Sequence, residues 1–266
     1  MNDERRLQRA RAFDDIAELY DQARREPPEQ LFTDLFALAA IEPTNANVLE
    51  IGCGTGQATL PLARRGCRVV GVEMGPNLAR IARRKLSPFP GVKVVNARFE
   101  EWESNDLVDI VVAVTSWHWL DPRLRYARAA AALRPGGVLA FTTGGHAFPR
   151  GFDPFFSEIR ACYEAMGETD FEWPPAPPQE TPDAREEIEQ SGYFDDVRVA
   201  RRLWVEEFTA DEYVRLLSTF SDHRLMEAAK RERLFGEVRQ RIAARRGGCI
   251  RKHNLTILHV ARRKSC

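Results

Sequence analysis

The stretch VLEIGCGTGQ, residues 48–57, decides the fold of this 266-residue chain. A short, mostly apolar strand runs there straight into three alternate glycines, Gly52, Gly54 and Gly56. Glycine lets the backbone turn tightly and come close to a ligand. The helix expected over 57–65 points its free amides at that ligand, which favours a carboxylate or a phosphate. The stretch therefore predicts a ligand-binding loop at the end of a strand.

Strands and helices alternate on both sides of this loop. The expected strands are 47–51, 67–73, 92–96, 107–114, 138–142, 197–208 and 255–262. The expected helices are 7–20, 29–40, 57–65, 76–86, 122–133, 152–166, 183–191 and, as one or two helices, 210–245. Strands that alternate with helices in this way are typical of βαβ units. The sequence therefore predicts an α/β fold with a doubly wound parallel sheet.

The order of these elements indicates one catalytic domain in three parts. Residues 1–46 are expected to supply N-terminal helices that cover the site, and 47–145 to form the cofactor-binding core. Residues 146–266 are expected to complete the sheet and to carry helical lid insertions. Among these, the proline-rich segment 171–182 cannot be helical and is expected to be a loop or lid, with the glycines at 144–145 as its hinge.

Charge and cysteine content narrow the class of protein. Lys plus Arg and Asp plus Glu both number 39, and this zero net charge argues against a duplex-binding protein. The five cysteines show no metal-ligand spacing, so neither a metal site nor a disulfide framework is indicated. The N-terminus is polar, the apolar runs stay below the roughly 18 residues that span a bilayer, and free thiols favour a reducing compartment. The sequence thus predicts a cytoplasmic protein that binds neither nucleic acid nor membrane.

Two kinds of cofactor loop compete for residues 52–57. A dinucleotide loop reads G-x-G-x-x-G and is followed about 20 residues later by an acidic residue. Here the third glycine would fall on Gln57, and the loop instead reads G-x-G-x-G with Glu50 two residues before it. Glu73, at the end of the next expected strand, can accept both hydroxyls of a ribose. On the loop alone, an NAD-dependent oxidoreductase therefore stays open.

The run EIGCGTG, residues 50–56, resembles motif I of the class I S-adenosylmethionine-dependent methyltransferases. The segments DIV at 109–111 and LRPGGVL at 133–139 resemble later motifs of that family. The resemblance extends from about residue 13 to residue 262. It implies a Rossmann-like sheet of seven strands, mostly parallel with the last strand antiparallel, and helical cap additions. It also implies S-adenosylmethionine as cofactor and S-adenosylhomocysteine as its product.

The resemblance assigns cofactor-binding residues as well. Glu50 would help to orient the methionine part, Glu73 would bind the ribose, and Met74 would lie beside the adenine. The family often has Asp-Ala in the region of 96–100, but here Arg98 stands at the Asp position, which leaves the backbone of Phe99 to bind the adenine edge. The implied cofactor site comprises Glu50, Gly52, Cys53, Gly54, Gly56, Gln57, Glu73, Met74, Arg98, Phe99, Glu100 and Thr115.

The acceptor is expected beyond the fourth strand, because ligands of open α/β sheets lie outside the carboxyl ends of the strands. There the chain reads TSWHWLDP, residues 115–122, which together with AELYD at 17–21 resembles the type 11 branch that includes trans-aconitate methyltransferase-like enzymes. His118 is the first candidate for a general base, since imidazole titrates near neutrality. His223 and Tyr20 are second candidates, and packing is the alternative role of all three.

The sequence thus predicts methyl transfer to an oxygen, nitrogen or carbon atom of a small molecule. The alternatives are an NAD-dependent oxidoreductase and a protein that binds S-adenosylmethionine without transferring its methyl group. Methylation of nucleic-acid bases commonly needs an Asn/Asp-Pro-Pro-aromatic motif after the fourth strand, where this chain has TSWH at 115–118. The expected partner is therefore a small-molecule acceptor, and the expected assembly is a monomer or homodimer.

Overall fold

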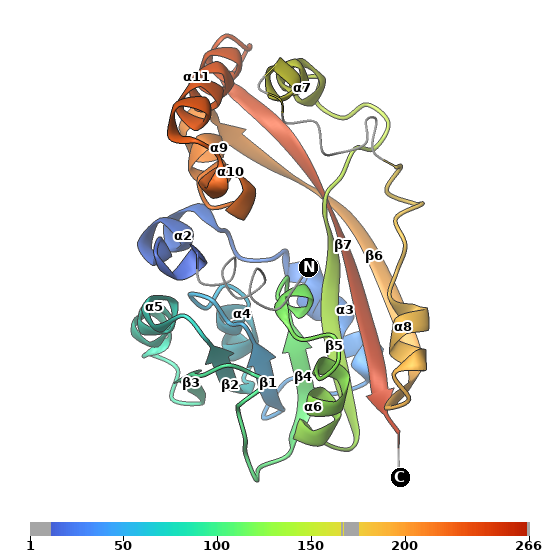
Figure 1. Ribbon diagram of the computed structural model, residues 1–266. Coiled ribbons are helices and arrows are strands. Elements are labelled where there is room, and N and C mark those ends of the chain that lie inside the picture. Colours follow the sequence, from blue (N-terminus) through green and yellow to red (C-terminus); the bar gives the residue numbers. More distant parts are fainter. Residues whose placement is uncertain (1–11, 166, 168–175, 265–266) are drawn as a thin grey trace. The chain divides into compact units, whose positions relative to one another are not determined.

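The computed structural model describes residues 12–165, 167 and 176–264 (Figure 1). Seven strands form one sheet in the order β3-β2-β1-β4-β5-β7-β6. The strands are β1 (Asn47–Ile51), β2 (Arg68–Glu73), β3 (Val92–Asn96), β4 (Val108–Ala113), β5 (Leu133–His146), β6 (Phe194–Thr209) and β7 (Cys249–Arg263). The chain order reverses between β1 and β4, which is where open α/β sheets bind their ligands.

Helices connect these strands. Those in the described residues are α2 (Ala17–Ala23), α3 (Glu29–Ala39), α4 (Thr59–Arg64), α5 (Pro76–Leu86), the 3-10 helix η1 (Trp117–Trp119), α6 (Arg125–Ala132), α7 (Phe155–Ala165), α8 (Arg185–Gln190), α9 (Ala210–Leu217), α10 (Ser221–Leu225) and α11 (Ala228–Ala243). The pairs β1–β2, β1–β4, β2–β3 and β4–β5 are parallel, and β7 is the antiparallel strand (Figure 1). The predicted seven-stranded, Rossmann-like α/β fold is confirmed.

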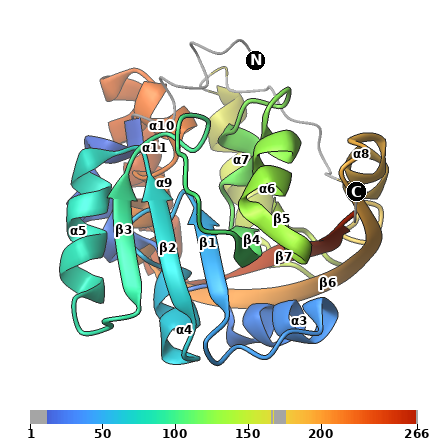
Figure 2. The ribbon, with the colours of Figure 1, turned by 90° about the horizontal axis from the view of Figure 1, so that it is seen from below.

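Helices cover both faces of the sheet because its central strands are apolar and buried over most of their length. One face packs against α6 and α8, through residues that include Ala129 and Ile188. The opposite face packs against α3 and α4, through residues that include Phe32 and Leu62. Figure 2 shows α3 and α4 on one side of the sheet and α6 on the other. This packing leaves the carboxyl ends of β1, β2 and β4 to carry the loops that form the candidate site.

The chain divides into two compact units. The first unit comprises the described residues of Met1–Thr143, Asp183–Arg201 and Ile257–Cys266, and the second those of Gly144–Pro182 and Arg202–Thr256. The second unit has its own core, in which Phe155 of α7, Tyr213 of α9 and Val238 of α11 are buried. The strands β5, β6 and β7 each begin in one unit and end in the other. The part predicted as 146–266 is therefore shared between the units.

Several predicted boundaries need correction. The helix after the glycine loop begins at Thr59 instead of 57, because the preceding residues form turns. The LRPGG segment belongs to β5, where it produces an irregular register opposite β4, instead of forming a turn before the strand. Residues 210–245 form three helices, because extended backbone at Met226 and Glu227 separates α10 from α11.

Two predicted segments lie partly outside the described residues. Of the helix predicted over 7–20, residues 7–11 are not described. Residues 12–14 are helical, but a turn at 15–16 interrupts the predicted helix, and α2 then extends from Ala17 to Ala23. Of the proline-rich segment 171–182, only 176–182 is described, and it is irregular. Within the described residues, no helix has the length and apolar character that crossing a membrane requires.

Candidate functional site

The glycine loop follows β1 and lies against the end of β4. Gly52, Gly54 and Gly56 have φ angles of +67°, +56° and +92°, in the left-handed region that glycine adopts without strain. A Cβ atom on Gly52 would lie 2.7 Å from the Cβ atom of Ser116, which follows β4. Glycine is therefore required at 52 both by its backbone angle and by the close approach of the next strand.

The other predicted side chains of the loop make local contacts. Cys53 is buried, and its Sγ atom lies 2.9 Å from the position that a Cβ atom on Gly71 of β2 would take. Burial raises the pKa of the Cys53 thiol, so the side chain stays neutral and fills the space beside the glycine. Gln57 donates a hydrogen bond from Nε2 to Oγ1 of Thr55 at 2.6 Å. This contact orders the end of the loop.

Glu73, at the end of β2, joins the glycine loop to the start of α5. One carboxylate oxygen accepts the N–H of Gly54 at 2.9 Å, and the other accepts the N–H of Gly75 at 2.8 Å. Burial raises the pKa of Glu73, and the two backbone N–H groups oppose that rise. Each carboxylate oxygen has a second lone pair, so both can also accept a hydroxyl. The arrangement suits two neighbouring hydroxyls of a ribose.

Glu50 lies behind the loop, in the core. Its side chain is buried, and its carboxylate accepts a hydrogen bond from Oγ1 of Thr59 at 2.6 Å. Burial raises the pKa of Glu50 to about 7, although the Thr59 hydroxyl lowers it. Glu50 thus ties the end of β1 to the first turn of α4. Its assigned role toward the methionine part of the cofactor stays a prediction.

Hydrogen bonds and an ion pair hold the segment that is predicted to lie beside an adenine. Asn96 donates from Nδ2 to the carbonyl oxygens of Glu73 and Met74, at 2.8 and 3.0 Å. Arg98, at the position where the family often has Asp, donates to Glu101 at 3.0 Å. Glu100 accepts the N–H of Asp121 at 3.1 Å.

Phe99 anchors this segment, because its side chain is buried in the core between the sheet and α6. Its side chain is therefore part of the core, and contact between its backbone and an adenine stays a prediction. Arg98 stands where the resemblance implies an adenine-binding carboxylate, and its guanidinium lies within 4 Å of two acids, Glu100 and Glu101.

The end of β4 is strained and tightly held. Thr115 has a φ angle of +55° and donates its N–H to Oγ1 of Thr142 at 2.9 Å. A positive φ at a β-branched residue is costly and is typical of functional sites. Ser116 donates from Oγ to the carbonyl oxygen of Ile51, and the ring of Trp117 stacks on Phe141 at 4.8 Å. These contacts fix the direction in which the chain leaves β4.

His118 follows from this fixed segment. Its ring lies 4.6 Å from that of Trp119 and keeps an exposed edge. Loss of hydration on the side of its neighbours, and then the positive charge of Arg125, lowers the pKa of His118. At neutral pH the imidazole is therefore uncharged and able to accept a proton.

Tyr20 of α2 lies against the glycine loop. A Cβ atom on Gly54 would be 3.6 Å from Cε1 of Tyr20. Burial raises the pKa of Tyr20, and the positive charge of Arg24 opposes the rise. The phenol therefore stays protonated at neutral pH and is a hydrogen-bond donor instead of a base. Phe13 contacts both Tyr20 and Trp119, with ring centroids 5.8 and 5.7 Å apart.

His223 belongs to α10 in the second unit, whereas Tyr20, His118 and the glycine loop belong to the first. Its Nε2 atom forms a hydrogen bond of 2.8 Å with the hydroxyl of Tyr163, and its ring packs against Phe235. Burial lowers the pKa of His223 to about 4, so the ring is neutral. The structure thus brings Tyr20 and the cofactor residues together within one unit and gives His223 aromatic surroundings in the other.

Several residues at this site were missed by sequence reasoning. Thr59 binds Glu50, Ser116 contacts Gly52, and Asn96 holds the carbonyl groups of Glu73 and Met74. Ser116 and Asn96 lie in segments that resemble the family, but no role was predicted for either side chain. The closest available signal was position, since each borders a predicted loop or strand end.

Asp109, in the DIV segment, behaves differently from a residue of the site. It accepts the N–H of Asn47 at 2.7 Å and pairs with Arg134. These contacts lie at the start of β1 and β4, at the opposite end of the strands from the glycine loop. Asp109 therefore joins strands and does not contribute to the candidate site.

Known proteins with similar sequences match this same region. Residues 48–137 match the family described as "Methyltransferase domain". An uncharacterized methyltransferase of Mycobacterium tuberculosis is 33% identical over 129 residues, which are 48% of this chain and 50% of the relative. A trans-aconitate 2-methyltransferase of Rhodopseudomonas palustris is 38% identical over 96 residues, which are 35% of this chain and 36% of the relative. The matches thus span about half or less of the length of these curated relatives.

Solved structures match over more of the chain. A candidate type II methyltransferase from Anaeromyxobacter dehalogenans superposes with a TM-score of 0.62 at 24% identity, covering 91% of this chain and 97% of that one. Phosphoethanolamine N-methyltransferase 2 of Haemonchus contortus, solved with phosphomonomethylethanolamine and S-adenosylhomocysteine, has a TM-score of 0.56 at 18% identity, covering 100% of this chain and 61% of that one. At these identities the likeness establishes the fold.

Proposed function

We propose that the protein transfers a methyl group from S-adenosylmethionine to a small-molecule acceptor, because residues 48–137 match the family described as "Methyltransferase domain" and the fold is that of solved methyltransferases. The observation that carries the proposal is the carboxylate of Glu73. It is bonded to Gly54 of the glycine loop and to Gly75 at the start of α5, with lone pairs left for two ribose hydroxyls.

The residues present fit this cofactor. Glycines with left-handed backbone form the loop where the methionine part would lie, and the phenol of Tyr20 borders that loop. Glu73 would hold the ribose, and Met74 with the backbone of Phe99 would border the adenine. Arg98 replaces the usual adenine-binding carboxylate, so recognition of the adenine would depend on the backbone. The other residues that we propose for the cofactor site are Glu50, Cys53, Gln57, Glu100 and Thr115.

S-adenosylmethionine, when bound, supplies a methyl group that is activated by the adjacent sulfonium. The contribution of this chain is to align an acceptor with that group, exclude water and, where required, remove a proton. The strained end of β4 fixes the direction of His118, and its lowered pKa leaves the imidazole free to take that proton. Tyr20 is protonated and would donate a hydrogen bond. A carboxylate acceptor would need alignment alone, without a base.

A small acceptor is favoured over a polymer. The chain lacks an Asn/Asp-Pro-Pro-aromatic motif after β4, where base methyltransferases commonly have one, and its net charge is zero. Its relatives include three that are named for trans-aconitate, one for ubiquinone biosynthesis and one for malonyl-[acyl-carrier protein]. We propose that the protein acts in the cytoplasm as a monomer or homodimer. We also propose that it belongs to the type 11 branch of the class I methyltransferases. His223 is proposed as a second candidate for acceptor contact from the second unit.

Calorimetric titration tests the cofactor. S-adenosylmethionine, S-adenosylhomocysteine and NAD are titrated into the wild-type protein, Glu73→Ala and Glu103→Ala. The last is a matched control, an exposed acid that pairs with Arg128. We expect micromolar binding of the first two ligands and weakening by about 10- to 100-fold in Glu73→Ala, because two charge-assisted hydrogen bonds are lost.

The same titration distinguishes the alternatives. Binding of NAD alone would identify an oxidoreductase and overturn the proposal. Once the cofactor is established, single turnovers with radiolabelled methyl donor and panels of small acids, phenols and amines identify the acceptor. Tight binding without transfer to any acceptor would instead indicate a protein that binds S-adenosylmethionine without methylating.

A further inference from the structure

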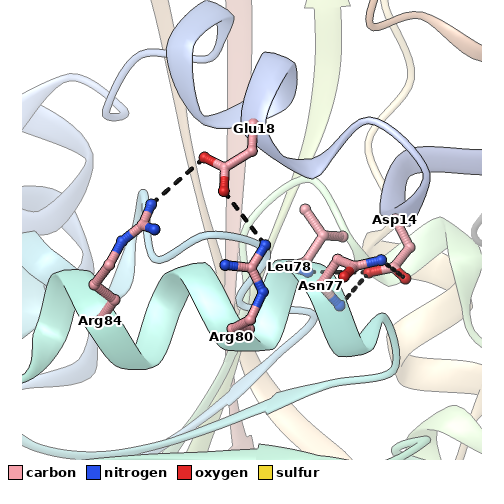
Figure 3. A network of polar contacts seen from close by, with 6 residues as sticks. All are labelled: Asp14, Glu18, Asn77, Leu78, Arg80 and Arg84. Carbon is pink, nitrogen blue, oxygen red and sulfur yellow. Dashed lines mark hydrogen bonds and ion pairs between the residues drawn. The ribbon is translucent and has the colours of Figure 1, made fainter.

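A segment that precedes the sheet provides the cap of a helix at the site. We call residues 12–23 the N-terminal strap; it includes α2. Oδ1 of Asp14 in the strap accepts the N–H groups of Asn77 and Leu78, at 2.8 and 3.0 Å (Figure 3). Oδ2 accepts Nδ2 of Asn77 at 3.0 Å. Because the residue that precedes α5 is Gly75, which has no side chain, the strap supplies the capping group that α5 itself lacks.

Opposite charges hold the rest of the strap along α5. Figure 3 shows Glu18 directed at two arginines on successive turns of the helix, Arg80 at 3.3 Å and Arg84 at 3.4 Å. Asp21 pairs with Lys85 at 3.0 Å. Each exposed pair contributes little to stability. Several of them along one contact surface nevertheless make the position of the strap sensitive to salt.

The apolar side of the strap reaches the cofactor loop. Ala17 is buried against Leu78 and Ile81 of α5, and Phe13 and Tyr20 pack on this cluster. Tyr20 also borders Gly54, as described above. The strap therefore rests on α5 with one side and on the glycine loop with the other.

Glu73 lies between these two points of contact. Its carboxylate binds Gly54, which Tyr20 borders, and Gly75, where a Cβ atom would lie 2.6 Å from Oδ1 of Asp14. Only 6% of Glu73 is exposed, and the two glycines that it binds both lie beside side chains of the strap.

We propose that Asp14 is a positioning residue for the cofactor: it latches the N-terminal strap onto α5, and the strap leaves α5 to admit S-adenosylmethionine and returns to hold it. This proposal rests on the cofactor proposed above. The latch acts through the cap of α5 and through the charges of Glu18 and Asp21, and none of these groups needs to touch the cofactor.

Binding kinetics of S-adenosylhomocysteine test the latch. Stopped-flow tryptophan fluorescence follows binding, and Trp119, one of the five tryptophans, contacts Phe13 of the strap. In Asp14→Ala we expect the dissociation rate to rise about 10-fold, the association rate about 2-fold and Kd about 5-fold, because a lost cap leaves the strap open more often. Asp14→Asn keeps an oxygen acceptor for the α5 amides and should restore most of the wild-type behaviour.

Variants of the arginines on α5 test the ion pairs between this helix and the strap. S-adenosylhomocysteine has no net charge at neutral pH, so an effect of salt on its dissociation reports on the protein. Between about 0.05 M and about 0.5 M salt, we expect wild-type dissociation to accelerate roughly 3-fold as the ion pairs are screened. Arg80→Gln/Arg84→Gln should be fast at both salt concentrations. Arg83→Gln is the matched control, because Arg83 lies on the same helix but donates to the carbonyl oxygen of Val94.

Each outcome decides between two ideas. If the wild-type protein does not bind S-adenosylhomocysteine, both the proposed function and the latch are overturned. If it binds but the rates of Asp14→Ala and Arg80→Gln/Arg84→Gln equal those of the wild type, the latch alone is overturned. A purely structural role for Asp14 would lower the melting temperature and leave both rate constants of the folded protein unchanged. If Asp14→Ala fails to fold, Asp14→Asn and the arginine variant decide.

Discussion

At the scale of single residues, Glu50 is the least exposed acid in the described part of the chain. It is 2% exposed, and burial raises its pKa to about 7. The pKa of a glutamate in an unfolded chain is about 4.3. Between these pH values the folded protein therefore retains a proton that the unfolded chain has lost. The stabilisation from this proton is fully present below about pH 4.3 and is lost as the pH rises through about 7.

Glu50→Gln should therefore flatten the dependence of stability on pH. As the pH rises from about 5 to about 8, we expect the ionisation of Glu50 to lower the free energy of unfolding of the wild-type protein by about 2 to 3 kcal/mol. A pKa difference of one corresponds to about 1.4 kcal/mol. The glutamine stays neutral and keeps an oxygen for the Thr59 hydroxyl. Urea titrations at both pH values measure the difference. Glu101→Gln, an exposed neighbour of Arg98, serves as control, and equal slopes in Glu50→Gln and wild type would contradict the pKa.

Residue identity could be predicted where the signal is local. The glycines and Glu73 lie at or just after strand ends, so their places beside one loop followed from spacing, whereas the resemblance to motif I implied the place of Glu50. Asp14 could not be found this way, because it acts on α5 from 63 residues away. Its side chain is a helix cap only in the folded molecule, and nothing in its immediate sequence indicates that.

At the scale of elements, α9 has the best-defined start. Thr209 accepts the N–H of Glu212 at 3.4 Å, and the Glu212 carboxylate accepts the N–H of Thr209 at 2.9 Å. This reciprocal pair is a capping box, which satisfies two backbone donors at once. It fixes the point at which β6 ends and α9 begins.

Thr209→Ala should loosen α9 locally. Loss of the cap is expected to cost about 1 kcal/mol, which corresponds to roughly 5-fold faster hydrogen exchange at the first amides of α9. Thr209→Ser keeps the hydroxyl and should exchange like the wild type. Exchange measured by mass spectrometry on peptides from α9, with α5 peptides as internal reference, checks this. Unchanged protection in Thr209→Ala would show that packing alone defines the start of the helix.

Element boundaries followed from sequence where local chemistry defines them. The limits of α5 agree with prediction, since Pro76 stands at its first position and apolar residues recur at helical spacing. β7 was predicted to start at 255 but starts at Cys249. The prediction missed its first half because that half carries polar residues, which are nevertheless buried. Lys252 donates to Asn254, which donates to Glu206 of β6. Pairing across strands makes such a segment a strand, and a single sequence does not reveal the partner.

At the scale of the whole molecule, the predicted cofactor residues all belong to the first unit, yet three strands run unbroken through both units. Backbone hydrogen bonds within one strand cannot easily be kept on one side of a boundary and lost on the other. We therefore expect the two units to unfold as one cooperative transition.

A ligand should consequently stabilise parts of the molecule that it does not touch. With S-adenosylhomocysteine at about 100 times its Kd, binding should add about 2.7 kcal/mol to the free energy of unfolding. Hydrogen exchange in urea should show this gain in peptides from α4 of the first unit and, equally, from α11 of the second. A gain confined to α4 would show that the units unfold separately.

The path of the chain between the units also limits how such an enzyme can diversify. The second unit is made of two separate stretches, 144–182 and 202–256, and three of its four junctions with the first unit fall inside β5, β6 and β7. A single genetic crossover cannot transplant this unit onto the core of another enzyme without leaving a hybrid strand. We therefore expect relatives with this architecture to diverge by substitution instead of by exchange of this unit.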